Sequence, residues 1–190
     1  MNLLTEIEVK KIITDSVKQV YEENDTKDFS EGKLHHHFSK AFVAGIGRQF
    51  SRKYAGDEFV TKFQDYKEGK IVSGEWLFDA VVVKRENVEL KDKILNYSSK
   101  VIVALESELA PGEKAFFDDF TKLLVVNAEK KIYINGIKNI KQKEKYISER
   151  MNLINSILKI QTENSSYIIC FVDYPSFWKN DEIFVRIIEI

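Results

Sequence analysis

Two glutamates separated by one residue close an apolar run in VIVALESEL, the segment from residue 101 to residue 109. Because side chains alternate along a β-strand, Glu106 and Glu108 would point to the same side of a strand. A third acid, Asp79, interrupts the apolar run WLFDAVVV. A buried aspartate without a partner is energetically costly, so its position indicates either a partner or a chemical role.

If the strands that carry Asp79, Glu106 and Glu108 are neighbours, three carboxylates come close together. Two unit charges about 4 Å apart repel each other by about 4 kcal/mol at an effective dielectric constant of about 20. Mg²⁺ would relieve this repulsion, because it combines one or two carboxylates with waters and phosphate oxygens. The sequence therefore predicts a Mg²⁺ site at these three acids, with Glu75, on the Asp79 face, as a further candidate ligand. The alternative is a set of solvated acids at strand ends.

Hydrophobic periodicity predicts an alternation of helices and strands around these acids. A broken helical pattern covers residues 3–22, and an amphipathic helix is expected over 31–54. Strands are expected at 58–66, 71–84 and 101–109, with a polar stretch at 85–100. The Pro111-Gly112 pair opens a helix to about 128, followed by a strand at 130–136, a helix at 139–160 and strands at 166–174 and 182–190. This order predicts an α/β (α+β) fold in which helices flank one central mixed β-sheet.

Four segments together resemble the PD-(D/E)xK nuclease superfamily, which has the restriction-endonuclease-like fold. They are FDAVVV, VIVALESEL, EKAFFDDFTKLLVVNA and KKIYI. The resemblance covers about residues 31–135 and implies an αβββαβ core. The whole chain, 1–190, would then be one nuclease-like domain with an added N-terminal helix and a C-terminal αββ extension.

The resemblance implies roles for individual residues. Asp79 matches the motif aspartate, Glu106 matches the acidic member of the (D/E)xK element, and Glu108 occupies its lysine position, as in Glu-x-Glu variants. Phe78 stands where the motif has proline. Lys114 and Lys122 are conceivable replacements for the lysine, but at about 100° per residue Lys122 falls opposite the stripe of Phe116, Phe120 and Leu124 and is expected to face solvent.

The expected activity is that of a Mg²⁺-dependent DNA endonuclease, with a type II restriction-like role as one candidate within this class. Asp79 and Glu106 would hold the ion, and Glu108 would hold a second ion or accept the proton of the attacking water. Two other interpretations remain open. One is a non-catalytic DNA-binding or protein-interaction member of the same fold, and the other is an unrelated α/β structural or regulatory subunit.

Three basic residues at the end of the first long helix, Arg48, Arg52 and Lys53, are candidate contacts to DNA phosphates. Alternatively, they belong to an ordinary solvated helix face. A homodimer is expected, because a two-fold pair of subunits is suited to paired cuts in duplex DNA.

Composition sets limits on these expectations. The 190 residues carry a net charge of −1, from 29 basic and 30 acidic residues, which argues against binding nucleic acid by bulk charge alone. The single cysteine, Cys170, excludes an intramolecular disulfide and is expected in the core. The N-terminal residues lack the pattern of a signal peptide, and no run approaches about 18 apolar residues. A cytoplasmic protein that does not enter a membrane is expected.

Overall fold

The computed structural model describes residues 4–23, 31–67, 70–71, 77–91, 93–110, 112–138, 140–160, 166–178 and 183–190. Within these ranges the helices are α1 (Glu6–Glu23), α2 (Glu31–Lys53), α3 (Glu113–Leu124) and α4 (Lys143–Leu158), with short 3₁₀ turns at Ile140–Gln142 and Pro175–Phe177. The strands of the main sheet are β1 (Phe59–Phe63), β4 (Ala80–Leu90), β5 (Lys93–Glu108), β6 (Ala128–Ile137), β7 (Ser166–Asp173) and β8 (Val185–Glu189). A second, two-stranded sheet joins β2 (Tyr66–Lys67) to β3 (Lys70–Ile71).

The main sheet is open and mixed, with the strand order β1-β4-β5-β6-β7-β8. β1, β4 and β5 form an antiparallel meander, β6 and β7 run parallel to β5, and β8 is antiparallel to β7. The connection from β5 to β6 contains α3, as a parallel crossover requires. The expected α/β (α+β) class is confirmed, and the order of helix, three strands, helix and strand is present in α2, β1, β4, β5, α3 and β6.

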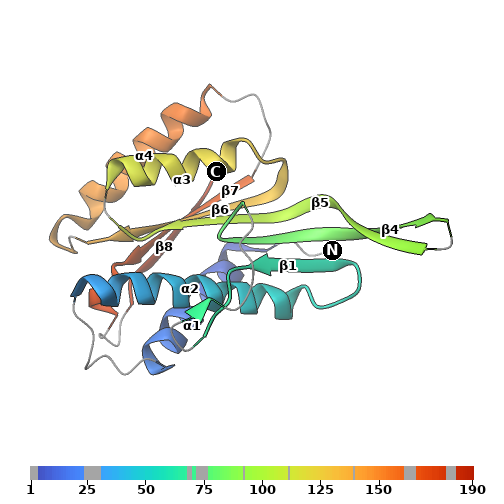
Figure 1. The fold of residues 1–190 in the computed structure, drawn as a ribbon. Helices are drawn as coiled ribbons and strands as arrows, with labels where there is room; N and C mark the ends of the chain where they lie inside the picture. The colour runs from blue at the N-terminus through green and yellow to red at the C-terminus, as the bar shows by residue number, and fades with distance from the viewer. Residues whose placement is uncertain are drawn as a thin grey trace.

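The helices cover both faces of the sheet, α1 and α2 on one and α3 and α4 on the other (Figure 1). Each face has its own apolar core, one centred on residues such as Phe42 and Val103, the other on residues such as Phe116 and Tyr133. Cys170 is fully buried in the first core, as expected. None of the described helices is both long enough and apolar enough to cross a membrane.

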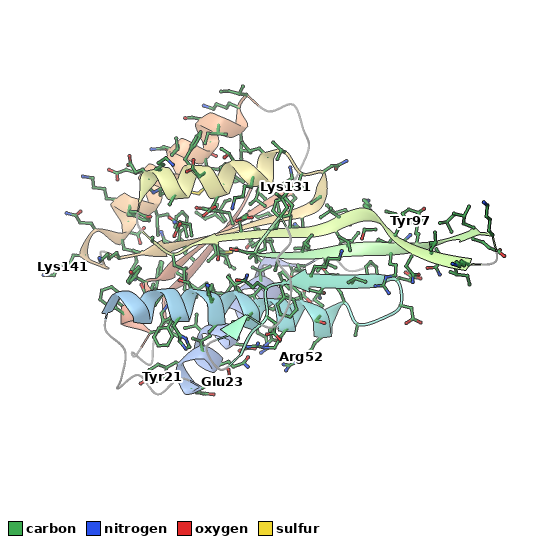
Figure 2. The ribbon with its side chains drawn as sticks, viewed as in Figure 1. Tyr21, Glu23, Arg52, Tyr97, Lys131 and Lys141 are labelled. Atoms are coloured by element: carbon green, nitrogen blue, oxygen red, sulfur yellow. The ribbon has the colours of Figure 1, made fainter. Side chains whose placement is uncertain are left out.

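The polar stretch at 85–100, for which no strand was predicted, belongs to β4 and β5, which continue through it as a long hairpin arm. The arm turns at Lys91, which has a φ of 47°, and projects beyond the helices (Figure 1). Its side chains are mostly exposed, including Val88, Leu95 and Tyr97, the last labelled in Figure 2. Apolar and polar residues alternate clearly only where one face of a strand is buried, so a strand pair exposed on both faces leaves no such pattern.

Candidate functional site

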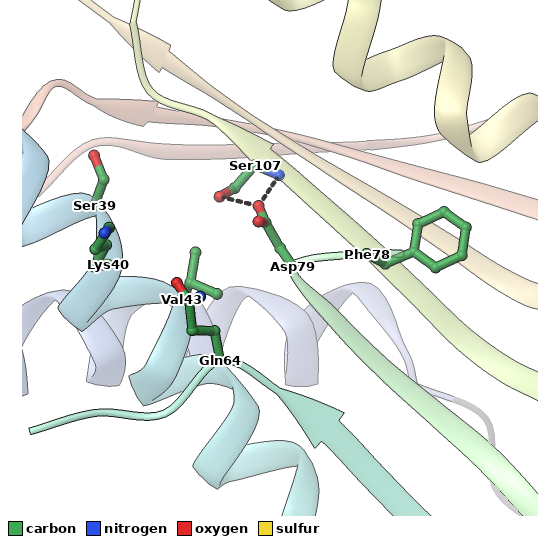
Figure 3. A pocket seen from close by; sticks show the side chains of 7 residues that line it. All are labelled: Ser39, Lys40, Val43, Gln64, Phe78, Asp79 and Ser107. Carbon is green, nitrogen blue, oxygen red and sulfur yellow. Dashed lines mark hydrogen bonds between the residues drawn. The ribbon is translucent and has the colours of Figure 1, made fainter. Parts of the chain in front are cut away.

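Asp79 lies in a bend, not inside a strand as predicted. Residues 77–79 precede the first residue of β4, Ala80, which pairs with Leu105 of β5. The Asp79 carboxylate is held by Ser107, whose backbone N–H and hydroxyl both donate to Oδ2 at 2.8 Å (Figure 3). The residue between the two glutamates therefore fixes the aspartate. Glu75 lies outside the described residues.

The end of β5 that carries Glu106 and Glu108 packs closely against β6. Glu108 pairs with Asn135 in the parallel register, and the Asn135 side-chain amide donates to the Glu108 carbonyl oxygen at 2.9 Å. A Cβ atom on Gly136 would lie 2.2 Å from the carbonyl oxygen of Leu109, so only glycine permits this approach of the two backbones. The glutamates therefore stand on a rigid part of the sheet.

Two residues of α3 complete the site. The Lys122 ammonium donates to Glu106 Oε2 at 3.2 Å and lies 2.7 Å from Asp119 Oδ1. Asp79, Glu106, Glu108 and Asp119 are hereafter called the acidic cluster, and Lys122 is the cation that contacts it. Electrostatic interactions link its members, since Asp119 acts on each of the other three and Asp79 acts on both glutamates.

Lys122 is exposed, as predicted, but its ammonium also contacts Glu106. Asp119 was not predicted as a site residue. The buried stripe of α3 consists of Phe116, Phe120 and Leu123, whereas Leu124 is only half-buried. With Leu123 in place of Leu124, the centre of the stripe moves by about 30° toward Asp119 and Lys122, at about 100° per residue. The i, i+3 spacing of an acid and a lysine beside an apolar stripe was the available signal.

Glu106 is the most deeply buried member of the acidic cluster, with 2% of its surface exposed. Its Oε2 atom contacts Lys122, but its Oε1 atom is buried and has no hydrogen-bond partner among the described residues. Burial, followed by the charge of Asp79, raises the pKa of this carboxyl to about 8, although Lys122 acts in the opposite direction. At neutral pH the group therefore retains a proton unless a cation takes the proton's place.

Burial also raises the pKa of Asp79 and of Glu108. Hydrogen bonds oppose these shifts, from Ser107 in the first case and from the backbone N–H of Ala110 in the second. Burial lowers the pKa of the Lys122 ammonium, but the hydrogen bond to Asp119 and the Glu106 charge outweigh it and raise the pKa overall. Lys122 therefore stays charged, with Asp119 as its firm partner, while Glu106 is the group that takes up a proton.

The acidic cluster fits a hard cation only with a small protein ligand set. Among the described residues, no three His, Cys, Asp or Glu side chains are grouped closely enough to surround a metal ion. Mg²⁺ needs only one or two carboxylates and completes its shell with waters and phosphate oxygens. The Glu106 oxygen without a partner among the described residues is a suitable ligand atom, and Asp79, whose charge acts on Glu106, is a candidate for the second.

Comparison of the chain with protein-family models, curated proteins and solved structures finds no match. Arguments about function therefore depend on the chemistry of the residues themselves. The acidic cluster, the contact with Lys122 and the buried, unpartnered oxygen are the features on which such arguments can draw.

Two of the three basic residues expected to contact DNA are engaged in ion pairs. Arg48 donates to Asp65 at 2.7 Å, and both side chains are largely buried. Lys53 lies 2.5 Å from Glu8 of α1. Arg52 is exposed on the outer side of α2 and has no ion-pair partner among the described side chains (Figure 2). Contact of these residues with DNA stays a prediction, and Arg52 is the most accessible of them.

Substituting glutamine for Arg48 and, in a separate variant, for Arg52 should distinguish a residue that stabilises the fold from one that contacts DNA. Arg48→Gln should lower the free energy of unfolding by roughly 1–3 kcal/mol, because it leaves the Asp65 carboxylate largely buried without its cation. Arg52→Gln should change stability by less than about 0.5 kcal/mol and weaken DNA binding. Urea unfolding and a DNA-binding titration of both variants check this. Equal stabilities for the two variants would contradict the structural role of Arg48.

Proposed function

We propose that the chain hydrolyses phosphodiester bonds of DNA with a divalent cation, preferably Mg²⁺, bound at the acidic cluster. The main observation in its support is the buried Glu106 oxygen, which has no partner among the described residues, feels the charges of Asp79 and Asp119 and belongs to a carboxylate that contacts Lys122. A cation is the simplest ligand for an unpartnered oxygen in such surroundings. The order of α2, the β1-β4-β5 meander, α3 and β6 further supports a restriction-endonuclease-like fold.

Each residue of the cluster has a distinct task in this proposal. Asp79, oriented by Ser107, and Glu106 would hold the ion. A bound Mg²⁺ would polarise the phosphate and lower the pKa of a bound water. Glu108 would accept the proton of the attacking water as the new bond from oxygen to phosphorus forms and the ester bond breaks. Its Oε1 atom already accepts from Ala110, which fixes the carboxylate for this task.

Lys122 would perform the function of the motif lysine, which the Glu-x-Glu element lacks. It comes from α3, yet its ammonium contacts Glu106, so it reaches the acidic cluster from the helix. Its side chain is 44% exposed and can therefore also meet a substrate phosphate. A fixed ammonium stabilises the negative charge that develops on phosphate oxygens during transfer.

A non-catalytic DNA-binding or protein-interaction role is the second candidate. It is favoured by the Lys122–Glu106 pair and the two hydrogen bonds from Ser107 to Asp79, which satisfy part of the cluster without any cation. A proton on Glu106 would satisfy the remainder. On this account the cluster is a structural feature, and its acids need not reach a substrate. The homodimer also stays a prediction, which sedimentation of the purified chain tests.

Incubation of the purified protein with supercoiled plasmid tests the proposal. We expect nicking that requires Mg²⁺ or Mn²⁺ and that Asp79→Asn reduces by at least about 10²-fold, because this substitution removes a charged ligand of the ion. Asp118→Asn is a matched control, since Asp118 is exposed on α3 and pairs with Lys114. Absence of cation-dependent nicking, or equal nicking by the Asp79→Asn variant, would favour the non-catalytic role.

A further inference from the structure

A cavity of about 230 Å³ opens between α2 and the strand ends, and Asp79 and Ser107 form one of its walls (Figure 3). Gln64, which follows β1, also lines it. The opposite wall is α2, which contributes Ser39, Lys40 and Val43. The cavity thus meets the acidic cluster at Asp79, from the side of the sheet that faces α2.

The α2 wall of this cavity carries two polar groups that have no partners within the described part of the chain. Lys40 is half-buried, and no described carboxylate lies within ion-pair distance of it. The neighbouring Ser39 hydroxyl is buried and has no hydrogen-bond partner among the described residues. A half-buried ammonium without a counter-ion and an unsatisfied hydroxyl both favour an anionic, oxygen-rich ligand.

The strand wall carries the Asp79 carboxyl group and the α2 wall carries the Lys40 ammonium, and the cavity lies between them. Asp79 would favour a cation, whereas Lys40 would favour an anion. A phosphate group whose oxygens meet a cation at Asp79 on one side and the Lys40 ammonium on the other satisfies both walls. Pockets that enclose a whole drug-sized ligand measure about 300–1,000 Å³, so the smaller volume here suits one phosphate better than a whole nucleoside.

We propose that this cavity binds one backbone phosphate of a nucleic acid strand, with Lys40 and Ser39 as its donors on α2. This inference rests on the proposed function and names the part of the substrate that enters from the α2 side. It assigns Lys40 as a positioning residue, which contacts a phosphate but reads no base. Recognition at this cavity is therefore independent of base sequence.

The test is the salt dependence of binding to a fluorescein-labelled DNA oligonucleotide, measured by fluorescence anisotropy with Ca²⁺ in place of Mg²⁺. The slope of log K against log salt is negative. Loss of one phosphate contact should reduce its magnitude by about 0.9 on duplex or about 0.7 on a single strand. Lys40→Gln should show this loss and bind several-fold more weakly on any sequence. Lys40→Arg should retain the slope of the unmodified protein.

Lys18→Gln is the matched control, since it removes the same charge from an exposed lysine on α1. An unchanged slope in Lys40→Gln, an equal change in Lys18→Gln, or no binding by the unmodified chain would overturn the inference. If Lys40→Gln reduces the magnitude of the slope but the unmodified protein does not nick DNA in Mg²⁺ or Mn²⁺, the phosphate site is supported and the proposed hydrolysis is contradicted. If Lys40→Gln changes neither the nicking rate nor the slope, the phosphate site is contradicted and the proposed hydrolysis is not.

Discussion

Glu106→Gln should make the protein more stable at pH 9, by roughly 2–4 kcal/mol, and should abolish cation-dependent nicking. Folding raises the pKa of this carboxyl from an ordinary value of 4.5 to about 8. Between these two values the folded state binds more protons than the unfolded state, so the stability of the unmodified protein falls as pH rises from about 4.5 to about 8. Glutamine carries no charge at any pH and removes this loss.

Urea unfolding in EDTA at pH 5.5, 7 and 9 measures the effect. The gain from Glu106→Gln should be smallest at the lowest pH and should be nearly complete at the highest. Glu89→Gln is the control, because Glu89 is exposed on the hairpin arm. If the free energy of unfolding depends on pH in the same way in both variants and in the unmodified protein, Glu106 does not carry the buried charge that the structure indicates.

Lys122→Met should reduce nicking by roughly 10²–10³-fold, the loss typical when one fixed donor to a developing negative charge is removed. The substitution also removes the cation that contacts Glu106 and Asp119. We therefore expect a further rise in the pKa of Glu106, because Lys122 acts to lower it. Lys122→Arg should keep part of the activity, since it keeps the charge but not the geometry of an ammonium.

Lys114→Met is the matched control for this prediction. Lys114 lies on the same helix, is 91% exposed and pairs with Asp118. Its loss should leave nicking within about twofold. Nicking rates are to be compared at a temperature where unfolding curves show all variants folded. Equal effects of the two lysine substitutions would exclude a special role for Lys122.

The sequence predicted those elements whose one face is buried, because burial imposes a period on the residues. The helices α2, α3 and α4 and the strands β5, β6 and β7 follow this pattern near their predicted positions. The hairpin arm did not, since both of its faces meet solvent and no alternation of apolar residues is required. The start of β4 also differed, because the bend at Asp79 is set by its bonds to Ser107, which lies 28 residues further along the chain.

The candidate site was predictable only in part, for a similar reason. The i, i+2 rule placed Glu106 and Glu108 on one side of β5, and in the structure the charges of Asp79 and Asp119 act on both of them. The contribution of α3 depended on which edge of its apolar stripe packs on the sheet. Lys122 lies beside the buried stripe of Phe116, Phe120 and Leu123, so its ammonium reaches Glu106 although its side chain is 44% exposed.

Binding of Mn²⁺ to the purified chain tests most directly whether the acidic cluster is a cation site. Electron paramagnetic resonance of free Mn²⁺, recorded during a titration with protein, reports the bound fraction without any need for a substrate. We expect saturable binding that competes with Mg²⁺ and is lost in both Asp79→Asn and Glu106→Gln but retained in Asp118→Asn. Binding that is absent, or equal in all four proteins, would contradict the account.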